Sequence, residues 1–140
     1  MQQLPIFPLN TVLFPGAALP LRIFEQRYKE MLEQCLASNQ RFGISLIRTG
    51  TEVGGESEPY EIGTVAQILK VGQAKSGVIP IETVGTQRFR IEQIKNATPY
   101  ITGEVTLLGD DVDIDAEPAS KYARAISDEY LRHLLTAQGE

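Results

Sequence analysis

The stretch that decides the fold is FPLNTVLFPGAALPLRIFEQRY, residues 7–28. It carries three prolines and one glycine among aliphatic and aromatic side chains, and it ends in a charged segment. A proline inside a helix removes a hydrogen bond and clashes with the preceding turn, so the first part is not helical. Its apolar content is too high for a solvated loop. We therefore predict two short strands, residues 4–9 and 19–24, which form a hairpin-like pair.

The prolines and the glycine also predict where these strands lie. Pro5, Pro8 and Pro20 have no backbone N–H, and such residues are confined to the edges, ends or bulges of sheets. Pro15 pre-sets φ and Gly16 tolerates positive φ, so this pair predicts a turn. The opening stretch is thus expected to bend along the margin of a sheet, with its aliphatic side chains in the core.

After these strands the spacing of the apolar residues becomes helical. One stripe of a helix would collect Phe24, Tyr28, Met31, Leu32, Cys35 and Leu36. Glu25 and Lys29 are spaced i to i+4 on the solvent side, in the order that stabilises a helix. We predict a helix over residues 25–38, with Asn39 as its stop signal. Cys35 is predicted to be a core residue rather than a nucleophile, because a reactive thiolate needs a partly exposed, electropositive setting.

Short apolar runs with strand periodicity follow the helix. They cover residues 41–48, 61–71, 78–84, 87–91 and 100–108. Gly85 is expected to separate the third run from the fourth, and a phase slip near Ile68-Leu69 predicts a bulge. Residues 49–60 are rich in glycine and glutamate and predict a loop. Short strands separated by Gly and Pro turns favour a closed or nearly closed barrel. The expected fold class is mainly β with α (α+β).

A final helix is predicted beyond an acidic link, GDDVDIDAEP, residues 109–118. Asp115 is a suitable N-cap, and Glu117 and Pro118 fit the first turn. The apolar stripe of this helix would contain Ala119, Tyr122, Ala123, Ile126, Tyr130 and Leu134. The stripe could pack on the barrel, pair with a second copy of the chain, or contact a further extension.

Length and composition indicate one globular domain. The chain has 140 residues, of which 42% are hydrophobic and 22% are charged, as is ordinary for a globular protein. Its single cysteine excludes an internal disulfide. No apolar run approaches the ~20 residues that span a bilayer, and no signal peptide is visible. These features predict a cytoplasmic protein without a membrane partner.

The charge balance argues against nucleic acid as a partner. Thirteen Lys and Arg residues against eighteen Asp and Glu residues leave a net charge of −5, and the basic residues are scattered along the chain. Neutralisation of phosphates supplies most of the affinity of nucleic-acid binders, and it needs a basic face. A nucleic-acid partner is therefore not expected.

The sequence contains no set of residues that predicts catalysis. His133 is the only histidine, so a pair of histidine metal ligands is impossible within one chain. Lys75 and Ser76 are adjacent, but the following Gly77 predicts a hairpin turn rather than a catalytic dyad. Neither GxxxxGK[ST] nor GxGxxG occurs, which leaves nucleotide binding through such loops unsupported. We expect no catalytic residue and no cofactor.

The acidic link has one feature that suggests a metal. Asp111, Asp113 and Asp115 alternate, as at the start of an EF-hand calcium loop. Ala116 stands where that loop needs glycine, and Tyr122 stands where it needs a carboxylate. We therefore interpret these aspartates as a solvated link with a helix cap, and we expect no metal site.

Taken together, the motifs resemble those of a known family. LPIFPLNTVLFPGAALPLRIFEQRYKEM resembles the start of the Lon protease N-terminal domain, also called the LON substrate-binding domain. RFGISLI, EIGTVAQI, GTQRFRI and PYITGEVTLL match later parts of it in order. The resemblance covers about residues 4–108. It implies a PUA-like β-barrel over residues 1–116, with the first helix packed across one end. Residues 117–140 would form a C-terminal helix, where the family's helical extension begins.

The resemblance also implies a function. In Lon, this domain precedes a helical region, an ATPase module and a serine–lysine peptidase, and it is thought to help capture unfolded or tagged substrates. This chain has no Walker motif and no room for the peptidase, so it is similar to the free-standing members of the family. The resemblance leaves open whether the chain is a natural short form or a truncated one. The implied protein is a non-catalytic binding module for unfolded or extended polypeptides.

Partners and site residues follow as expectations from this resemblance. A protease, a chaperone or a second copy of the chain is a possible partner. The candidate peptide-binding surface contains Arg22, Glu25 and Arg27, although packing alone also explains the motif around them. Two alternatives stay open: an RNA-binding PUA-like module, by analogy of fold, and a partner-specific regulatory or structural subunit. A small hydrolase would need a pocket with converging polar groups.

Overall fold

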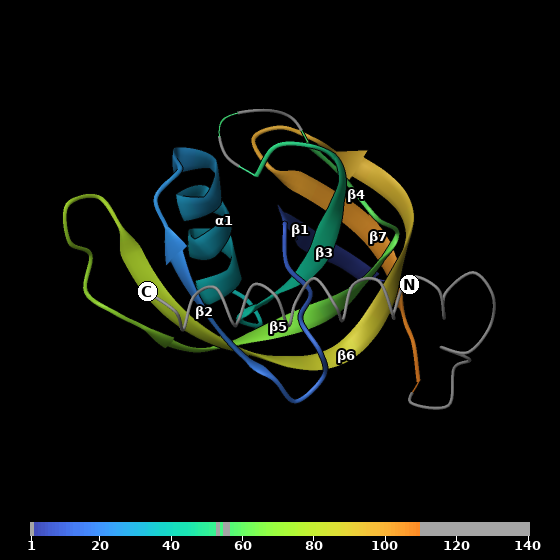
Figure 1. Cartoon of the computed structure of the whole chain (residues 1–140), viewed down its shortest axis with the longest axis horizontal. Coiled ribbons are helices and arrows are strands. Elements are labelled where there is room, and N and C mark those ends of the chain that lie inside the picture. The colour runs from blue at the N-terminus through green and yellow to red at the C-terminus, as the bar shows by residue number, and fades with distance from the viewer. Residues whose placement is uncertain (1, 53, 55–56, 110–140) are drawn as a thin grey trace.

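The computed structural model describes residues 2–52, 54 and 57–109, and they form a mainly β protein with one helix (Figure 1). In chain order the elements are β1 (Gln2–Leu9), β2 (Ala18–Ile23), α1 (Gln26–Leu36), β3 (Arg41–Gly50), β4 (Ser57–Pro59), β5 (Ile62–Val71), β6 (Ile79–Asn96) and β7 (Ile101–Leu107). The predicted fold class, α+β with strands predominant, is confirmed.

Five strands close into a barrel. They follow the order β1-β7-β6-β5-β3, and a parallel pairing of β1 with β3, from Ile6↔Gly43 to Leu9↔Leu46, joins the two ends. Closure removes the exposed edges that an open sheet would leave. The two remaining strands are additions to the barrel: β4 pairs with β3, and β2 pairs with β6.

Apolar side chains fill two separate clusters. The strand cluster comes from β1, β5, β6 and β7 and contains Leu4, Ile6, Val65, Phe89 and Val105. The helix-side cluster joins the buried face of α1 to the strands and contains Phe7, Leu9, Leu13, Ile23, Tyr28, Met31, Leu32, Cys35, Phe42, Ile44, Ala66, Ile68 and Ile81. β1 contributes to both clusters, from alternate residues. A strand covered on both faces needs apolar residues at both parities, which explains the nearly unbroken apolar run at the start of the chain.

The hairpin-like pairing predicted for the two opening strands is wrong. β1 pairs with β7 through residues 2–6 and with β3 through residues 6–9, whereas β2 pairs only with β6 among the described strands. Pro5 lies where β7 alone is the neighbour of β1, and Pro8 lies where β3 alone is the neighbour. Each proline can therefore direct its missing N–H to the side without a partner strand.

The break predicted at Gly85 is also wrong, because β6 is one continuous strand through this position. The Gly85 N–H donates to the Ala17 carbonyl, and the Gly16 N–H donates to the Gly85 carbonyl, each at 2.8 Å. A Cβ on Gly85 would collide with the Phe14 carbonyl oxygen and would lie 3.0 Å from the Leu13 Cγ. Glycine is needed here for the close approach of two backbones, not for a turn.

The first helix is confirmed, with corrections at its ends. It spans residues 26–36 rather than 25–38, and Tyr28, Met31, Leu32 and Cys35 of the predicted stripe are buried. Phe24 and Leu36 are 49% and 39% exposed, so the stripe is shorter than predicted. The positive φ that follows the helix is at Gln40 (60°) rather than at Asn39.

Two smaller predictions concern β5 and the hairpin that links it to β6. The bulge predicted near Ile68-Leu69 is confirmed by a register shift between Ile68 and Lys70. The turn predicted at Lys75-Ser76-Gly77 is confirmed as well: Ser76 and Gly77 both have positive φ, as a two-residue hairpin turn requires.

The loop predicted over residues 49–60 contains the short strand β4, which the sequence did not indicate.

The predicted C-terminal helix (117–140) and its N-cap Asp115 lie outside the described residues, as do His133 and the alternating aspartates. The domain boundary between residues 116 and 117 stays a prediction. Among the described residues, no helix is long and apolar enough to cross a membrane.

Candidate functional site

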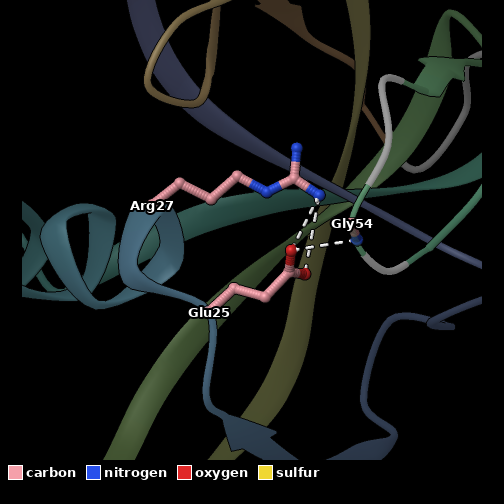
Figure 2. A network of polar contacts seen from close by, with 3 residues as sticks. All are labelled: Glu25, Arg27 and Gly54. Carbon is pink, nitrogen blue, oxygen red and sulfur yellow. Dashed lines mark hydrogen bonds and ion pairs between the residues drawn. The ribbon is translucent and has the colours of Figure 1, made fainter.

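The structure places the three predicted site residues around the junction of β2 and α1. Arg22 is in β2, Glu25 is the N-cap residue of α1, and Arg27 is in its first turn. The Arg27 guanidinium lies 3.2 Å from the Glu25 Oε1, and the Gly54 N–H donates to the same oxygen at 3.1 Å. Figure 2 draws both contacts as dashed lines. The fold therefore brings Glu25 and Arg27 together.

These contacts give Glu25 and Arg27 a structural role. Their side chains are only 19% and 26% exposed, and the Arg27 guanidinium also covers the Tyr28 ring, 4.7 Å from its centroid. Tyr28 in turn stacks on Phe7 at 4.0 Å. Burial raises the pKa of the Tyr28 phenol; Arg27 opposes this shift, and Glu25 adds to it. The pair fastens the residue 54 region to the helix and has little surface left for a ligand.

A second contact holds the same loop. The Asn10 N–H donates to the Glu52 Oε2 at 2.9 Å, so a carboxylate from the loop reaches the segment after β1. The loop is therefore held at two points. Glu25 at the start of the helix accepts from the loop backbone, and Glu52 of the loop accepts from the backbone after β1. The Glu52 carboxylate therefore has a structural contact that needs no ligand.

Arg22 differs from the other two residues. It is exposed, and it makes no ion pair or hydrogen bond with any residue that the structure describes. Its cross-strand neighbour is Pro80 of β6, which cannot compensate its charge. Of the three predicted site residues, Arg22 alone is a charged group available to a partner.

The strand that carries Arg22 has an unpaired edge, which the sequence indicated only through Pro20. The Gly85 N–H reaches the Ala17 carbonyl, and the pairing continues through Leu19↔Thr83 and Leu21↔Ile81, so odd-numbered residues of β2 direct their backbone groups towards β6. Because alternate residues of a strand point to opposite sides, the even-numbered residues direct theirs away from β6. No strand within the described ranges pairs with that edge. The prediction that Pro20 lies on an edge strand is confirmed.

Exposed apolar side chains lie near this strand. Phe24 follows β2 directly and is 49% exposed. Leu69 is 62% exposed at the bulge of β5, and β6 separates β5 from β2. Figure 1 shows β2 beside α1, with the β5–β6 hairpin projecting beyond the barrel. β2 and the residue that follows it therefore offer an unpaired backbone edge, an exposed cation and an exposed aromatic side chain, and Leu69 adds apolar surface two strands away.

Two observations on the described residues concern a nucleophile and a metal site. Cys35 is buried, its Sγ–H donates to the Arg41 carbonyl at 3.4 Å, and burial raises the pKa of the thiol to about 11. It is therefore a thiol rather than a thiolate near neutral pH, and its prediction as a core residue is confirmed. In the part of the chain that the structure describes, no cluster of three or more His, Cys, Asp or Glu side chains could hold a metal ion.

Curated Lon proteases are similar to this chain in sequence. The chain is 33% identical to the Lon protease of Flavobacterium johnsoniae over 104 residues, which are 73% of this chain and 13% of that protein. It is 32% identical to Lon protease 2 of Myxococcus xanthus over 111 residues, which are 78% of this chain and again 13% of the relative. The chain thus spans about 13% of the length of these curated relatives.

Solved structures share the fold. A Lon N-terminal domain protein from Xanthomonas campestris superposes with a TM-score of 0.68 at 33% identity, covering 81% of this chain and 63% of that one. The N-terminal domain of a Mycobacterium avium complex Lon protease gives a TM-score of 0.61 at 20% identity, over 78% of this chain and 56% of that one, which supports the fold alone. The model of the ATP-dependent protease La (LON) substrate-binding domain matches residues 3–139. This chain therefore belongs to the LON substrate-binding domain family.

Proposed function

We propose that this chain is a non-catalytic module that binds unfolded or extended segments of other proteins, in association with proteolysis. The observation that carries the proposal is the match to a substrate-binding domain over residues 3–139. The full-length relatives are proteases, and this chain corresponds to about 13% of their length. A substrate-recognition role without catalysis is the part of their activity that such a region could perform alone.

The surface around β2 supports this proposal physically. An extended chain binds through main-chain hydrogen bonds and through contacts of alternate side chains, and β2 offers both kinds of group. Phe24 and Leu69 add exposed apolar area, which unfolded proteins seek. Cys35 and Ser76, two nucleophile types that a hydrolase would use, lie in a core and in a hairpin turn.

The expected partners follow from the same reasoning. A single domain with a short edge should bind an extended polypeptide weakly, and its affinity would rise if several copies act together. Association with a second copy, a chaperone or a protease would supply that gain. Neither an RNA-binding role nor a partner-specific structural role is supported by the family match. The cytoplasmic location predicted from the sequence stays a prediction.

The test is a titration of a fluorescently labelled, permanently unfolded model polypeptide with this protein, at low and moderate salt. A label on the polypeptide is needed because the chain contains no tryptophan. We expect a saturable rise in anisotropy that persists at moderate salt, and an intact polypeptide after long incubation. No binding up to high micromolar protein would refute the proposed function. An RNA binder would instead show affinity for RNA that falls steeply with salt.

A further inference from the structure

We propose that the bound polypeptide adds to the sheet as a further strand along the outer edge of β2, with an acidic side chain beside Arg22. This inference rests on the function proposed above and names its site and the chemistry of its ligand. The occupant is an extended segment of another protein in which apolar and acidic residues alternate.

The backbone groups of β2 define what this edge can hold. Ala18, Pro20 and Arg22 direct their backbone away from β6, so the edge presents three carbonyl acceptors. It presents two N–H donors, from Ala18 and Arg22, because Pro20 has none. Residues outside β2 do not use these groups in the part of the chain that the structure describes. A row of unpaired donors and acceptors at strand spacing is complementary to an extended backbone and to little else.

The two faces of β2 define the side chains of the ligand. On the inner face, Ile23 is buried in the helix-side cluster and Leu21 packs against it. On the outer face, Ala18, Pro20 and Arg22 are exposed. A strand added beside β2 would alternate in the same way, with apolar residues next to the inner row and residues next to Arg22 on the outer row. Arg22 has no anionic partner among the described residues, so an acidic residue is the complementary choice.

The helix that follows β2 does not replace such a strand. The buried side chains of α1 belong to the helix-side cluster, together with Ile23 of β2 and Ile81 of β6. α1 therefore covers the inner face of this part of the sheet. A helix has no unpaired backbone groups along its length, so it cannot satisfy the edge.

Pro20 argues against a second copy of the chain as the occupant. In a symmetric antiparallel pairing of two β2 strands centred on this residue, the two prolines would face each other. Neither could donate to the carbonyl opposite it, so the centre of the joint would lack both hydrogen bonds. A foreign segment with an ordinary residue opposite Pro20 can donate its own N–H to the Pro20 carbonyl. The missing proline donor then costs one hydrogen bond and keeps binding weak.

The experiment uses the full chain and a fluorescein-labelled, end-capped heptapeptide of alternating valine and glutamate at nanomolar concentration, followed by anisotropy. Arg22→Glu should weaken binding of this peptide by about 3- to 10-fold, because a cross-strand pair of opposite charges becomes a like-charge pair. The matched control is Arg90→Glu, an exposed position of β6 outside the segment paired with β2. It makes the same change of net charge and should leave binding unchanged.

Pro20→Ala tests whether the ligand forms backbone hydrogen bonds with the edge of β2. It restores the missing donor and should tighten binding by roughly 2- to 10-fold, the effect of one net hydrogen bond. Peptides N-methylated on the glutamates, or alternatively on the valines, remove the donors of one edge of the ligand at a time. If the ligand pairs with β2, at least one of the two patterns abolishes binding. Methylated glutamates do so for an antiparallel strand, and methylated valines for a parallel one.

The possible results distinguish a failure of the proposed β2 site from a failure of the proposed polypeptide-binding function. If the unfolded model polypeptide binds but the heptapeptide does not, or if Arg22→Glu and both methylation patterns leave binding intact, the β2 site is overturned while the proposed function stands. If neither ligand binds, the function fails as well. Peptide binding that appears only after Asp111, Asp113 and Asp115 are changed to Asn would identify the chain's own acidic segment as the occupant and overturn a foreign ligand. Self-association that Arg22→Glu abolishes would identify a second copy.

Discussion

At two positions of this protein, contacts with distant parts of the chain explain the residue type better than local secondary-structure propensity does. At Gly85 two backbones meet at hydrogen-bond distance, and a side chain on this residue would collide with a carbonyl oxygen of the opposite segment. At Glu25 one carboxylate accepts hydrogen bonds from a helix residue and from a loop backbone. The sequence predicted a break between two strands at Gly85, and it did not predict that Glu25 contacts Gly54, because both contacts join residues far apart in the chain.

Gly85→Ala tests the close approach directly. We expect a loss of about 2 kcal/mol or more in the free energy of unfolding, because the backbone of residues 13–14 must move away from β6. Chemical denaturation measures this change. Glu82→Ala, at an exposed position of the same strand, is the control and should change stability by less than about 0.5 kcal/mol. Equal effects of the two substitutions would contradict the packing described here.

The reactivity of the Cys35 thiol tests whether the helix-side cluster is closed to solvent. The thiol should resist alkylating reagents in the native protein at pH 8 and react after unfolding, because it is buried and its pKa is raised to about 11. Rapid labelling of the native protein would show that the residue is exposed.

The raised pKa of the Cys35 thiol also predicts how stability depends on pH. The folded pKa exceeds the ordinary value of 9.0, so the native state favours the protonated thiol. The stabilising contribution is therefore complete below pH 9 and is lost as the pH rises towards 11. Relative to Cys35→Ala, the wild-type chain should lose stability across this interval. A constant difference between the two proteins in thermal melts from pH 8 to 11 would contradict the shift.

Among the elements, those with strong local patterns were predictable and those defined by distant partners were not. The periodicity of residues 24–36 predicted α1, and the turn residues at Ser76-Gly77 predicted the β5–β6 hairpin. The pairing of β1 with β3 and β7, by contrast, joins residues far apart in the chain, and the sequence instead favoured the neighbouring β2. The candidate site shows the same division: Pro20 indicated an edge strand, but only the register shows which backbone groups face outwards.

The hydrogen bond between Glu25, the N-cap residue of α1, and the Gly54 N–H can be tested by mutation. Glu25→Ala removes the acceptor of the Gly54 N–H and the partner of Arg27, so the loop over residues 49–60 should open more often. Limited proteolysis should cut this loop faster in the variant than in the wild type. Glu33→Ala, an exposed position on the same helix, should leave the cleavage rate unchanged. Polypeptide binding should survive Glu25→Ala, because the carboxylate does not belong to the β2 edge.

In the part of the chain that the structure describes, the molecule is a closed barrel of five strands to which β2, β4 and α1 are added. Each of the five barrel strands has a neighbouring strand on both sides, whereas β2 pairs with β6 alone among the described strands and so carries an unpaired edge along its length. The strand cluster joins side chains from four of the five barrel strands, and Phe89 is its largest member and is fully buried. Phe89→Ala should therefore cost about 3–5 kcal/mol of unfolding free energy, whereas Leu69→Ala, at a largely exposed position, should cost almost nothing. Thermal melts of the two variants would disagree with this account if their midpoints were equal.

The most direct test of the central claim is hydrogen exchange of the backbone amides, followed by NMR with and without the unfolded model polypeptide. In the free protein the amides of Ala18 and Arg22 face no partner strand among the described residues and should exchange fast, while those of Leu19 and Leu21 face β6 and should be protected. On binding, Ala18 and Arg22 should become protected. Saturable binding that leaves these two amides exchanging as before, or that protects another surface instead, would contradict the account.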